Sequence, residues 1–327
     1  MEAVEKVRIT VVVDNHVDAL LLERPDVKRF TMLNHFVPPH GEPICTENGI
    51  SYWIEVHQDG RRHHILFDTS LTSHVLLHNL RALGRSIDQL DHAVLSHGHP
   101  DHFGGLLGVL RERRRPLAIA VHPDAFLPKY IIDDAGNSVM TVNARLDRAE
   151  IERAGGVIVE SREPVNIAPG VLVTGQIPRD ESSTFEPPVP KRPPGPAGIF
   201  LERDGELVND DATIDDQAVV LNVRDRGLVV MTACGHSGIV NTIRHAQRLT
   251  GVDRIYAIMG GFHTGFMGIP EESGAATVDA LKEFDPTILA PMHCTGIKTI
   301  ARVVMAFPDQ FVHNTAGTTI TVGDEAA

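Results

Sequence analysis

The sequence predicts an α/β fold in which two sheets are flanked by helices. Short runs rich in β-branched residues, roughly ten or more, recur along the 327-residue chain at lengths typical of strands. Segments with apolar residues at helical spacing lie between them at intervals. Hydrophobic residues make up 42% of the chain, which at this length is enough for a sizeable core. Strands and helices mixed in this way favour layers of sheet covered by helices.

The predicted strands are short and rich in valine and isoleucine. The two strands on either side of residues 224–227, with the sequence RDRG, are expected to form a hairpin. The ten strands are residues 7–13, 51–57, 64–67, 92–96, 117–121, 171–174, 218–223, 227–233, 254–259 and 287–290.

The predicted helices are recognised by apolar spacing and by the residues at their ends. Three of them end at a glycine, and Ser237 is expected to be the N-cap of one. They cover residues 70–84, 106–114, 143–155, 237–251, 274–284 and 296–307.

A proline-rich and acidic segment at about residues 176–216 interrupts this pattern. Two interpretations are open. The segment is a solvated linker or insertion, or it is a lid that faces the substrate, since long loops in compact domains tend to be functional or disordered.

Composition restricts the partners and the compartment. The net charge of -13 argues against nucleic acid or an anionic membrane surface as the main partner. No apolar run reaches 18 residues, so no membrane span is expected. The three cysteines, Cys45, Cys234 and Cys294, do not suggest a disulfide framework. The first residues do not resemble a signal peptide, and we expect a cytoplasmic protein. The sequence indicates no oligomeric state.

Four metal-binding side chains follow the strand predicted at residues 92–96. His97, His99, Asp101 and His102 stand within six residues, directly before two glycines. Imidazole nitrogens and carboxylate oxygens are natural zinc ligands. Side chains two residues apart on an extended backbone point the same way, so His97 and His99 can hold one ion while Asp101 and His102 reach a second.

One loop cannot complete two coordination shells, so we expect further ligands at other strand ends. His236 and His293 are the candidate ligands there. His263 is a third candidate, or it lines the pocket and donates a hydrogen bond. Cys234 either binds metal as a thiolate or packs as a small buried residue, and Cys294 is expected to pack.

Asp68 also follows a predicted strand. We expect its carboxylate to orient a metal-bound imidazole from outside the coordination shell. The alternative is a cap for the helix predicted at residues 70–84.

The order H-x-H-x-D-H after a strand, with FDTS upstream and single histidines at later strand ends, resembles the metallo-β-lactamase superfamily. The resemblance implies a four-layer α/β/β/α sandwich, formed here as a single domain over residues 1–327 with an insertion at about 176–216. It implies a dinuclear site in which His97 and His99 bind the first metal ion, Asp101 and His102 bind the second, and His293 is the last histidine of the pattern. Oxygen-reducing relatives tend to carry Glu at the position of His99, so histidine there favours zinc, with manganese or iron as alternatives.

Several segments are similar to a narrower branch, the dihydropterin–ribofuranosylaminobenzene-phosphate synthase-like group. This branch usually has Gly-Cys-Ser-His where residues 233–236 read Ala-Cys-Gly-His. The wider superfamily has a histidine near Gln176 and a bridging Asp near Cys234, so His236 is the candidate for the third ligand of the first ion. The similar segments are VDN (13–15), ENGIS (47–51), VHPDAF (121–126), GQIPR (175–179), ACGHSGIVNTI (233–243), GGFHT (260–264) and HCTG (293–296).

The residues favour a zinc-dependent hydrolase that uses a metal-bound hydroxide on a small substrate, with anionic substrates as candidates. Asp101 and His263 are the candidate catalytic residues, and Asp101 could take a proton from the water. Arg179 could pair with a phosphate or carboxylate of the substrate, or it is a solvated surface residue. The alternatives are a pterin-linked transferase, which joins an arylamine to a dihydropterin with loss of pyrophosphate, and a ligand-binding sensor with little turnover.

Overall fold

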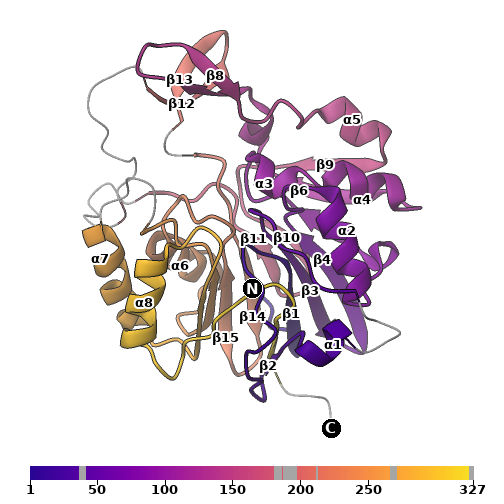
Figure 1. Ribbon diagram of the computed structural model, residues 1–327, viewed down its shortest axis with the longest axis vertical. Coiled ribbons are helices and arrows are strands. Elements are labelled where there is room, and N and C mark those ends of the chain that lie inside the picture. The colour runs from indigo at the N-terminus through magenta and orange to yellow at the C-terminus, as the bar shows by residue number, and fades with distance from the viewer. Residues whose placement is uncertain (37–41, 180–185, 187–196, 211–212, 266–270, 324–327) are drawn as a thin grey trace.

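The computed structural model describes residues 1–36, 42–179, 186, 197–210, 213–265 and 271–323. Two large sheets lie face to face at the centre of the molecule, and helices cover their outer faces (Figure 1). Helices α2, α4 and α5 pack on one sheet, and α6, α7 and α8 pack on the other. This is the four-layer α/β/β/α arrangement that the family resemblance implies.

The first sheet has eight strands in the order β2-β18-β1-β3-β4-β5-β6-β9. Phe67 of β4 pairs with Val94 of β5, and Val94 lies opposite Ala120 of β6, in parallel register. These three strands therefore end at the same edge of the sheet. The bounds are β1 Lys6–Val13, β2 Val27–Lys28, β3 Ser51–Gln58, β4 Arg61–Phe67, β5 His92–Val94, β6 Leu117–Val121, β9 Gly156–Glu160 and β18 Thr319–Val322.

The second sheet has six strands in the order β10-β11-β14-β15-β16-β17. The predicted hairpin at residues 224–227 joins β14 to β15. Met231 of β15 pairs in parallel with Met259 of β16, and Met259 pairs with Ala290 of β17, so these strands also end together. The bounds are β10 Val165–Ala168, β11 Val171–Val173, β14 Val219–Val223, β15 Gly227–Met231, β16 Ile255–Gly260 and β17 Ile288–Pro291.

Three apolar clusters separate the four layers, because the side chains of a strand alternate between its two faces. In β14, Val219 and Leu221 pack against the first sheet in the central cluster. Val220 between them points to the other face and packs against the helices α6 to α8. Strands that are buried on both faces read as continuous apolar runs, which explains why these runs were recognisable in the sequence.

All six predicted helices are present with shifted bounds, and local contacts explain the later starts of two of them. Helix α6 begins at Ile239, with Gly238 rather than Ser237 as its N-cap, because both the N–H and the side chain of Ser237 are hydrogen-bonded to Asp216. Helix α5 begins only at Arg148, where the Asp147 carboxylate accepts the N–H of Glu150. The helices are α1 Met32–Phe36, α2 Ser73–Ala82, α3 Pro100–Phe103, α4 Leu106–Glu112, α5 Arg148–Arg153, α6 Ile239–Thr250, α7 Glu271–Leu281 and α8 Ile297–Ala306, with 3₁₀ turns at Ile87–Gln89, Pro123–Phe126 and Lys282–Phe284.

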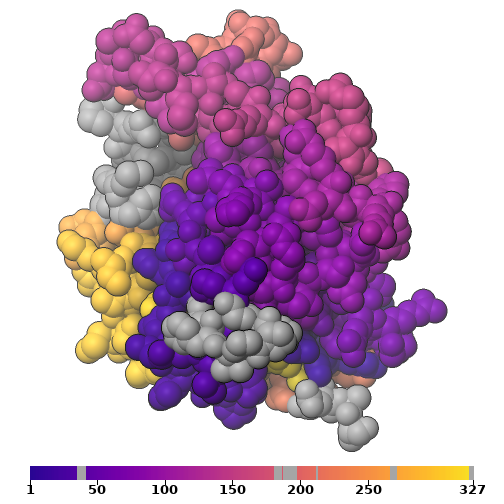
Figure 2. Space-filling view, turned by 45° about the vertical axis from the view of Figure 1, so that its right-hand side comes forward, coloured from indigo at the N-terminus to yellow at the C-terminus, as the bar shows by residue number. Residues whose placement is uncertain are grey.

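A small third sheet stands above the sandwich (Figures 1 and 2). Its order is β13-β12-β7-β8, and two of its strands come from the segment interpreted as a linker, insertion or lid. Residues 198–209 are therefore ordered as a hairpin and are not a solvated linker. Residues 180–185, 187–196 and 211–212 of that segment lie outside the described residues, and the lid interpretation stays a prediction. The strands are β7 Lys129–Ile132, β8 Ser138–Thr141, β12 Gly198–Arg203 and β13 Glu206–Asn209.

The described part of the chain contains no helix that is long and apolar enough to cross a membrane.

Glu186, from the same segment, is buried against the first turn of α6. Its carboxylate accepts hydrogen bonds from the backbone N–H groups of Val240 and Asn241, at 2.7 and 2.8 Å. Burial raises the pKa of the Glu186 carboxyl from 4.5 to about 7, despite these hydrogen bonds and the charge of Arg244. The folded protein therefore holds this proton at pH values where the unfolded chain has lost it.

We expect Glu186 to make the protein less stable as the pH rises from about 4.5 to about 7, by about 1–3 kcal/mol. In that window the unfolded state releases a proton that the folded state keeps, so the free energy of unfolding falls. The variant Glu186→Gln has no carboxyl to titrate at this position, so its free energy of unfolding should fall less between these pH values. Urea unfolding of both proteins at pH 5 and pH 8 measures the difference. An identical pH dependence for the two proteins would contradict the assignment.

Candidate metal centre

The loop after β5 carries four of the predicted ligands and is pressed against the chain that follows β4. A Cβ atom added to Gly104 would lie 2.0 Å from the carbonyl oxygen of Leu71. At Gly105 it would lie 2.2 Å from the carbonyl oxygen of Thr69. No side chain fits at either position, which explains the two glycines after His102. The loop turns directly into α3, with His99 as N-cap and Pro100 at the first helical position, where proline is favoured.

Three imidazoles are held by polar side chains at their Nδ1 atoms. Asp68 Oδ2 lies 2.6 Å from Nδ1 of His102, and this carboxylate also accepts hydrogen bonds from the N–H and hydroxyl of Ser96. Ser96 Oγ lies 2.9 Å from Nδ1 of His97. Asn15 follows β1, and its Oδ1 lies 3.2 Å from Nδ1 of His293. Each contact leaves the Nε2 atom of the ring for the centre of the site, as in outer-shell contacts of metal-binding histidines.

The site residues form three groups that could each hold a metal ion, within the residues that the structure describes. In each group the ligand atoms lie within 4.8 Å of one another, and Cys234 belongs to all three. The groups are Asp101, His102, Cys234 and His293; His97, Cys234 and His236; and Cys234, His263 and Cys294.

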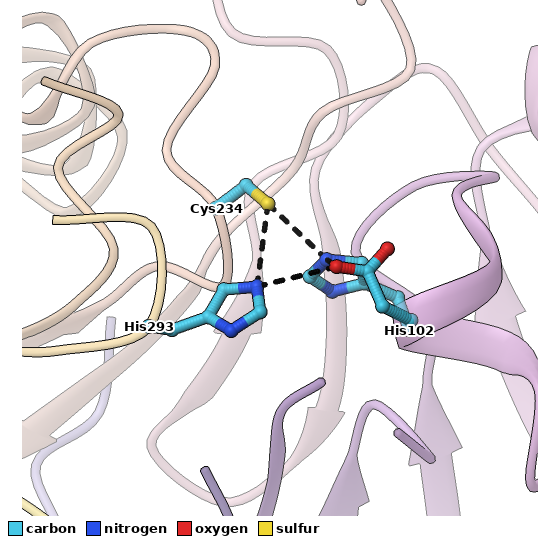
Figure 3. Close-up of side chains that lie close together, drawn as sticks. His102, Cys234 and His293 are labelled. Carbon is cyan, nitrogen blue, oxygen red and sulfur yellow. Dashed lines mark hydrogen bonds and ion pairs between the residues drawn. The ribbon is translucent and has the colours of Figure 1, made fainter. Parts of the chain in front are cut away.

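The Cys234 sulfur lies at the centre of this arrangement. It is 3.2 Å from Nε2 of His102 and 3.6 Å from Nε2 of His293 (Figure 3). On the carboxylate side, Asp101 Oδ2 is 3.5 Å from Nε2 of His102 and 3.6 Å from Nε2 of His293. These four atoms come from three separate strand ends and close a nearly complete shell of nitrogen, oxygen and sulfur donors.

His97, His99 and His236 form the neighbouring part of the site. The ring centroid of His97 is 4.4 Å from that of His99 and 4.7 Å from that of His236. His99 faces His97 with its Nδ1 atom, 2.9 Å from Nε2 of His97, and belongs to none of the three donor groups. The Nε2 atom of His236 is buried without a hydrogen-bond partner among the described residues. Leaving a buried ring nitrogen unbonded is unfavourable, and a metal ion is a natural partner for it. This donor set therefore fits a divalent transition metal.

Electrostatics keep four of these donors in the forms that bind metal. The other three favour their protonated forms. The carboxylates of Asp101 and Asp68 outweigh burial and raise the pKa of His102, and Cys294 does the same for the pKa of His293. Burial raises the pKa of Cys234, so metal binding must release protons from these three residues. Burial lowers the pKa of His97 and His236 well below the usual value, and the neighbouring imidazoles add to this effect. Burial also lowers the pKa of His99 to about 4. Burial alone would raise the pKa of Asp101, but the charges of His102 and His293 outweigh it and the pKa is lowered. Neutral imidazoles and an ionised carboxylate are the ligand forms that metal binding requires.

His263 and Arg179 lie at the rim of this cluster. His263 follows β16 in a left-handed backbone conformation, with φ at 48°, and its ring centroid is 4.0 Å from that of His236. The guanidinium of Arg179 donates to the carbonyl oxygen of His236. The Arg179 guanidinium thus supports the loop that carries His236, a candidate ligand. Pairing of Arg179 with a substrate stays a prediction.

A buried lysine connects the small sheet to the site. Lys129, on β7, is fully buried, and its Nζ lies 2.5 Å from Asp215 Oδ1 and 3.1 Å from Asp210 Oδ2. Asp215 Oδ2 in turn accepts the backbone N–H of Gly98, between His97 and His99, at 2.7 Å. Sequence reasoning missed Lys129 and Asp215, because nothing local indicates that they meet. It also assigned no role to Ser96 or Asn15, although both stand beside strand ends and Asn15 belongs to the segment VDN that is similar to the narrower branch.

The comparisons with known proteins decide the family. A family model described as the Metallo-beta-lactamase superfamily matches residues 47–293, more than half of the chain. The chain belongs to the metallo-β-lactamase superfamily. This establishes the predicted fold class and makes metal binding the ordinary expectation for the site.

Individual proteins are similar over most of the chain. A 7,8-dihydropterin-6-methyl-4-(β-D-ribofuranosyl)-aminobenzene-5'-phosphate synthase of Methanocaldococcus jannaschii is 30% identical over 89% of this chain and 95% of its own length. The uncharacterised protein MJ0448 of the same organism is 30% identical over 84% of this chain and 94% of its own. The crystal structure of Tm1679, a metal-dependent hydrolase of the superfamily, matches with a TM-score of 0.69 and 25% identity, over 97% of this chain and all of that one.

We expect Asn15→Ala to weaken metal binding by about 10–100-fold, the usual cost of losing an outer-shell partner. Without the Asn15 oxygen, the His293 ring is free to turn its Nε2 away from Asp101 and Cys234. Asn15→Asp keeps an acceptor at the same place and should bind metal more tightly than the alanine variant. A competition titration against a chromophoric chelator measures all three proteins. Equal affinity in Asn15→Ala and the parent protein would show that the contact does not position the ring.

Proposed function

We propose that this protein is a zinc-dependent hydrolase with a dinuclear metal centre. His97, His99 and His236 would hold one ion, and Asp101, His102 and His293 the other, with Cys234 between them. The observation that carries the proposal is the buried Nε2 atom of His236, which has no hydrogen-bond partner among the described residues, together with the single sulfur shared by the donor groups. Thiolate, imidazole and carboxylate in one shell favour zinc, and manganese and iron are the alternatives that metal analysis would separate.

Two bound metal ions would supply Lewis acidity, which makes water a usable nucleophile at neutral pH and polarises the bond to be broken. The protein's own side chains do the remaining work. The Asp101 carboxylate is ionised and is 22% exposed, so its Oδ2 can accept a hydrogen bond from a substrate or water in the site, and it is the first candidate for proton transfer. Asp68, Ser96 and Asn15 hold three imidazoles in fixed orientations. His263, beside His236, is the second candidate for proton transfer or for contact with the substrate.

The proposed substrate is a small molecule, with anionic compounds as candidates. Two observations support this. The donor cluster lies where several strands end, which is the usual position of small-ligand sites in α/β sheets. The basic Arg179 is held against the His236 loop at the rim of the cluster.

A pterin-linked transferase is the second candidate, and the 30% identity to the Methanocaldococcus jannaschii synthase favours it. In that reaction an arylamine displaces pyrophosphate from a dihydropterin, and the centre would stabilise the leaving anion. A binding protein with little turnover is the third.

We expect purified protein to contain about two zinc ions per chain by elemental analysis. It should hydrolyse at least one compound of a panel of esters, lactones, thioesters and phosphodiesters. His99→Ala should lose one ion and more than about 100-fold in kcat/KM, beyond the loss typical of an outer-shell partner. His74→Ala, which changes an exposed histidine on α2, is the matched control and should behave as the parent protein. Protein without transition metal, or with turnover that survives chelation and His99→Ala, would overturn the proposal.

The transferase is tested by offering a dihydropterin pyrophosphate together with a ribofuranosylaminobenzene phosphate. We expect no release of pyrophosphate if the protein is a hydrolase. Metal-dependent formation of the coupled product, with no hydrolysis of the panel, would replace the hydrolase by the transferase. Tight binding of a ligand that is unaffected by chelation and by His99→Ala would instead indicate the sensor.

A further inference from the structure

The thiols of Cys234 and Cys294 lie against each other at the edge of the metal centre. Their sulfur atoms are 3.3 Å apart, although the residues follow β15 and β17 and are separated by 60 positions. Cys234 is buried, and Cys294 is partly exposed. Neither the proposed metal pair nor the proposed catalysis uses Cys294. A thiol in contact with the shared metal-binding sulfur therefore needs an explanation of its own.

The distance between the two sulfurs is suited to bond formation. A disulfide bond is about 2.05 Å long, so the sulfurs need to approach by little more than 1 Å, which is within the reach of side-chain rotation. The third cysteine, Cys45, lies beside α2, where its backbone N–H and carbonyl are hydrogen-bonded to the Asn79 side chain. Among the three cysteines, only Cys234 and Cys294 are described in contact with each other.

We propose that Cys234 and Cys294 form a redox-sensitive dithiol, which a peroxide closes to an intrachain disulfide when the metal centre is empty. The consequence for the metal centre rests on the proposed function, since it requires Cys234 to be a metal ligand. A sulfur in a disulfide carries no negative charge and is a poor ligand. Oxidation and metal binding therefore exclude each other at Cys234.

The chemistry balances with hydrogen peroxide as the oxidant. The partly exposed Cys294 sulfur attacks one peroxide oxygen, the O–O bond breaks, and a sulfenic acid and one water form. The Cys234 sulfur then attacks the Cys294 sulfur, the S–O bond breaks, and a second water leaves. Two thiols lose two electrons and two protons in all, and one peroxide is reduced to two waters. A dithiol reductant reverses the step by thiol–disulfide exchange.

The test uses the full-length protein, stripped of metal or loaded with zinc. Both samples are exposed to an equimolar amount of hydrogen peroxide, and part of the oxidised metal-free sample is then reduced with dithiothreitol. Free thiols are counted in all samples by mass spectrometry after alkylation. We expect the metal-free protein to fall from three alkylated cysteines to one. A non-reduced peptide map should join Cys234 to Cys294. The zinc-loaded protein should form no Cys234–Cys294 disulfide, because zinc holds the Cys234 sulfur, and dithiothreitol should restore both thiols and zinc binding to the oxidised protein.

Two variants make the result specific. Cys45→Ser should fall from two alkylated cysteines to none, which shows that Cys45 takes no part. Cys294→Ser should form no intrachain disulfide. Three remaining thiols in the oxidised metal-free protein, or a bond that involves Cys45 or a second chain, would overturn the proposal. Equal oxidation of the zinc-loaded protein would overturn it as well, because the metal then does not cover Cys234. If the protein binds no metal, the proposed function fails while the peptide map still decides whether the dithiol exists.

Discussion

The site depends on the parallel register of two groups of strands. Phe67, Val94 and Ala120 lie side by side near the ends of β4, β5 and β6, and Met231, Met259 and Ala290 do so near the ends of β15, β16 and β17. The loops that follow are therefore delivered to one edge of the sandwich. Without that alignment, each histidine would be an isolated polar group at the end of an apolar strand. With it, residues nearly 200 positions apart contribute donors to one cluster.

The part of the site that could be predicted is the part in which position along the chain determines position in space. His97, His99, Asp101 and His102 were recognisable because their spacing after an apolar run already places them together. His236, His263 and His293 were recognisable because each follows a strand, and the ends of parallel strands meet. The apolar runs of the two central sheets were equally clear, because burial on both faces leaves few polar residues in them.

The part that could not be predicted rests on partners that are distant in the sequence. Lys129 is an unremarkable lysine in the sequence, and only the fold sets it between Asp210 and Asp215. The small sheet was missed because its strands are short and partly exposed, and two of them belong to a segment whose prolines suggested a loop. Ser237 has the chemistry of an N-cap, but its side chain and its N–H are both hydrogen-bonded to the buried Asp216. In each case a tertiary contact outweighed the local preference.

Several residues around the site hold backbone conformations that side chains avoid. Asp68, His263 and His293 all have positive φ angles, between 48° and 59°, and such conformations are unfavourable by about 1–3 kcal/mol each. The cluster also gathers polar side chains in a buried part of the protein. Three of the nine positive-φ residues other than glycine in the described chain thus lie at the candidate metal centre. Stabilising substitutions should therefore avoid the loops at the strand ends. They are better placed in the outer helical layers, where stability can rise without a loss of activity.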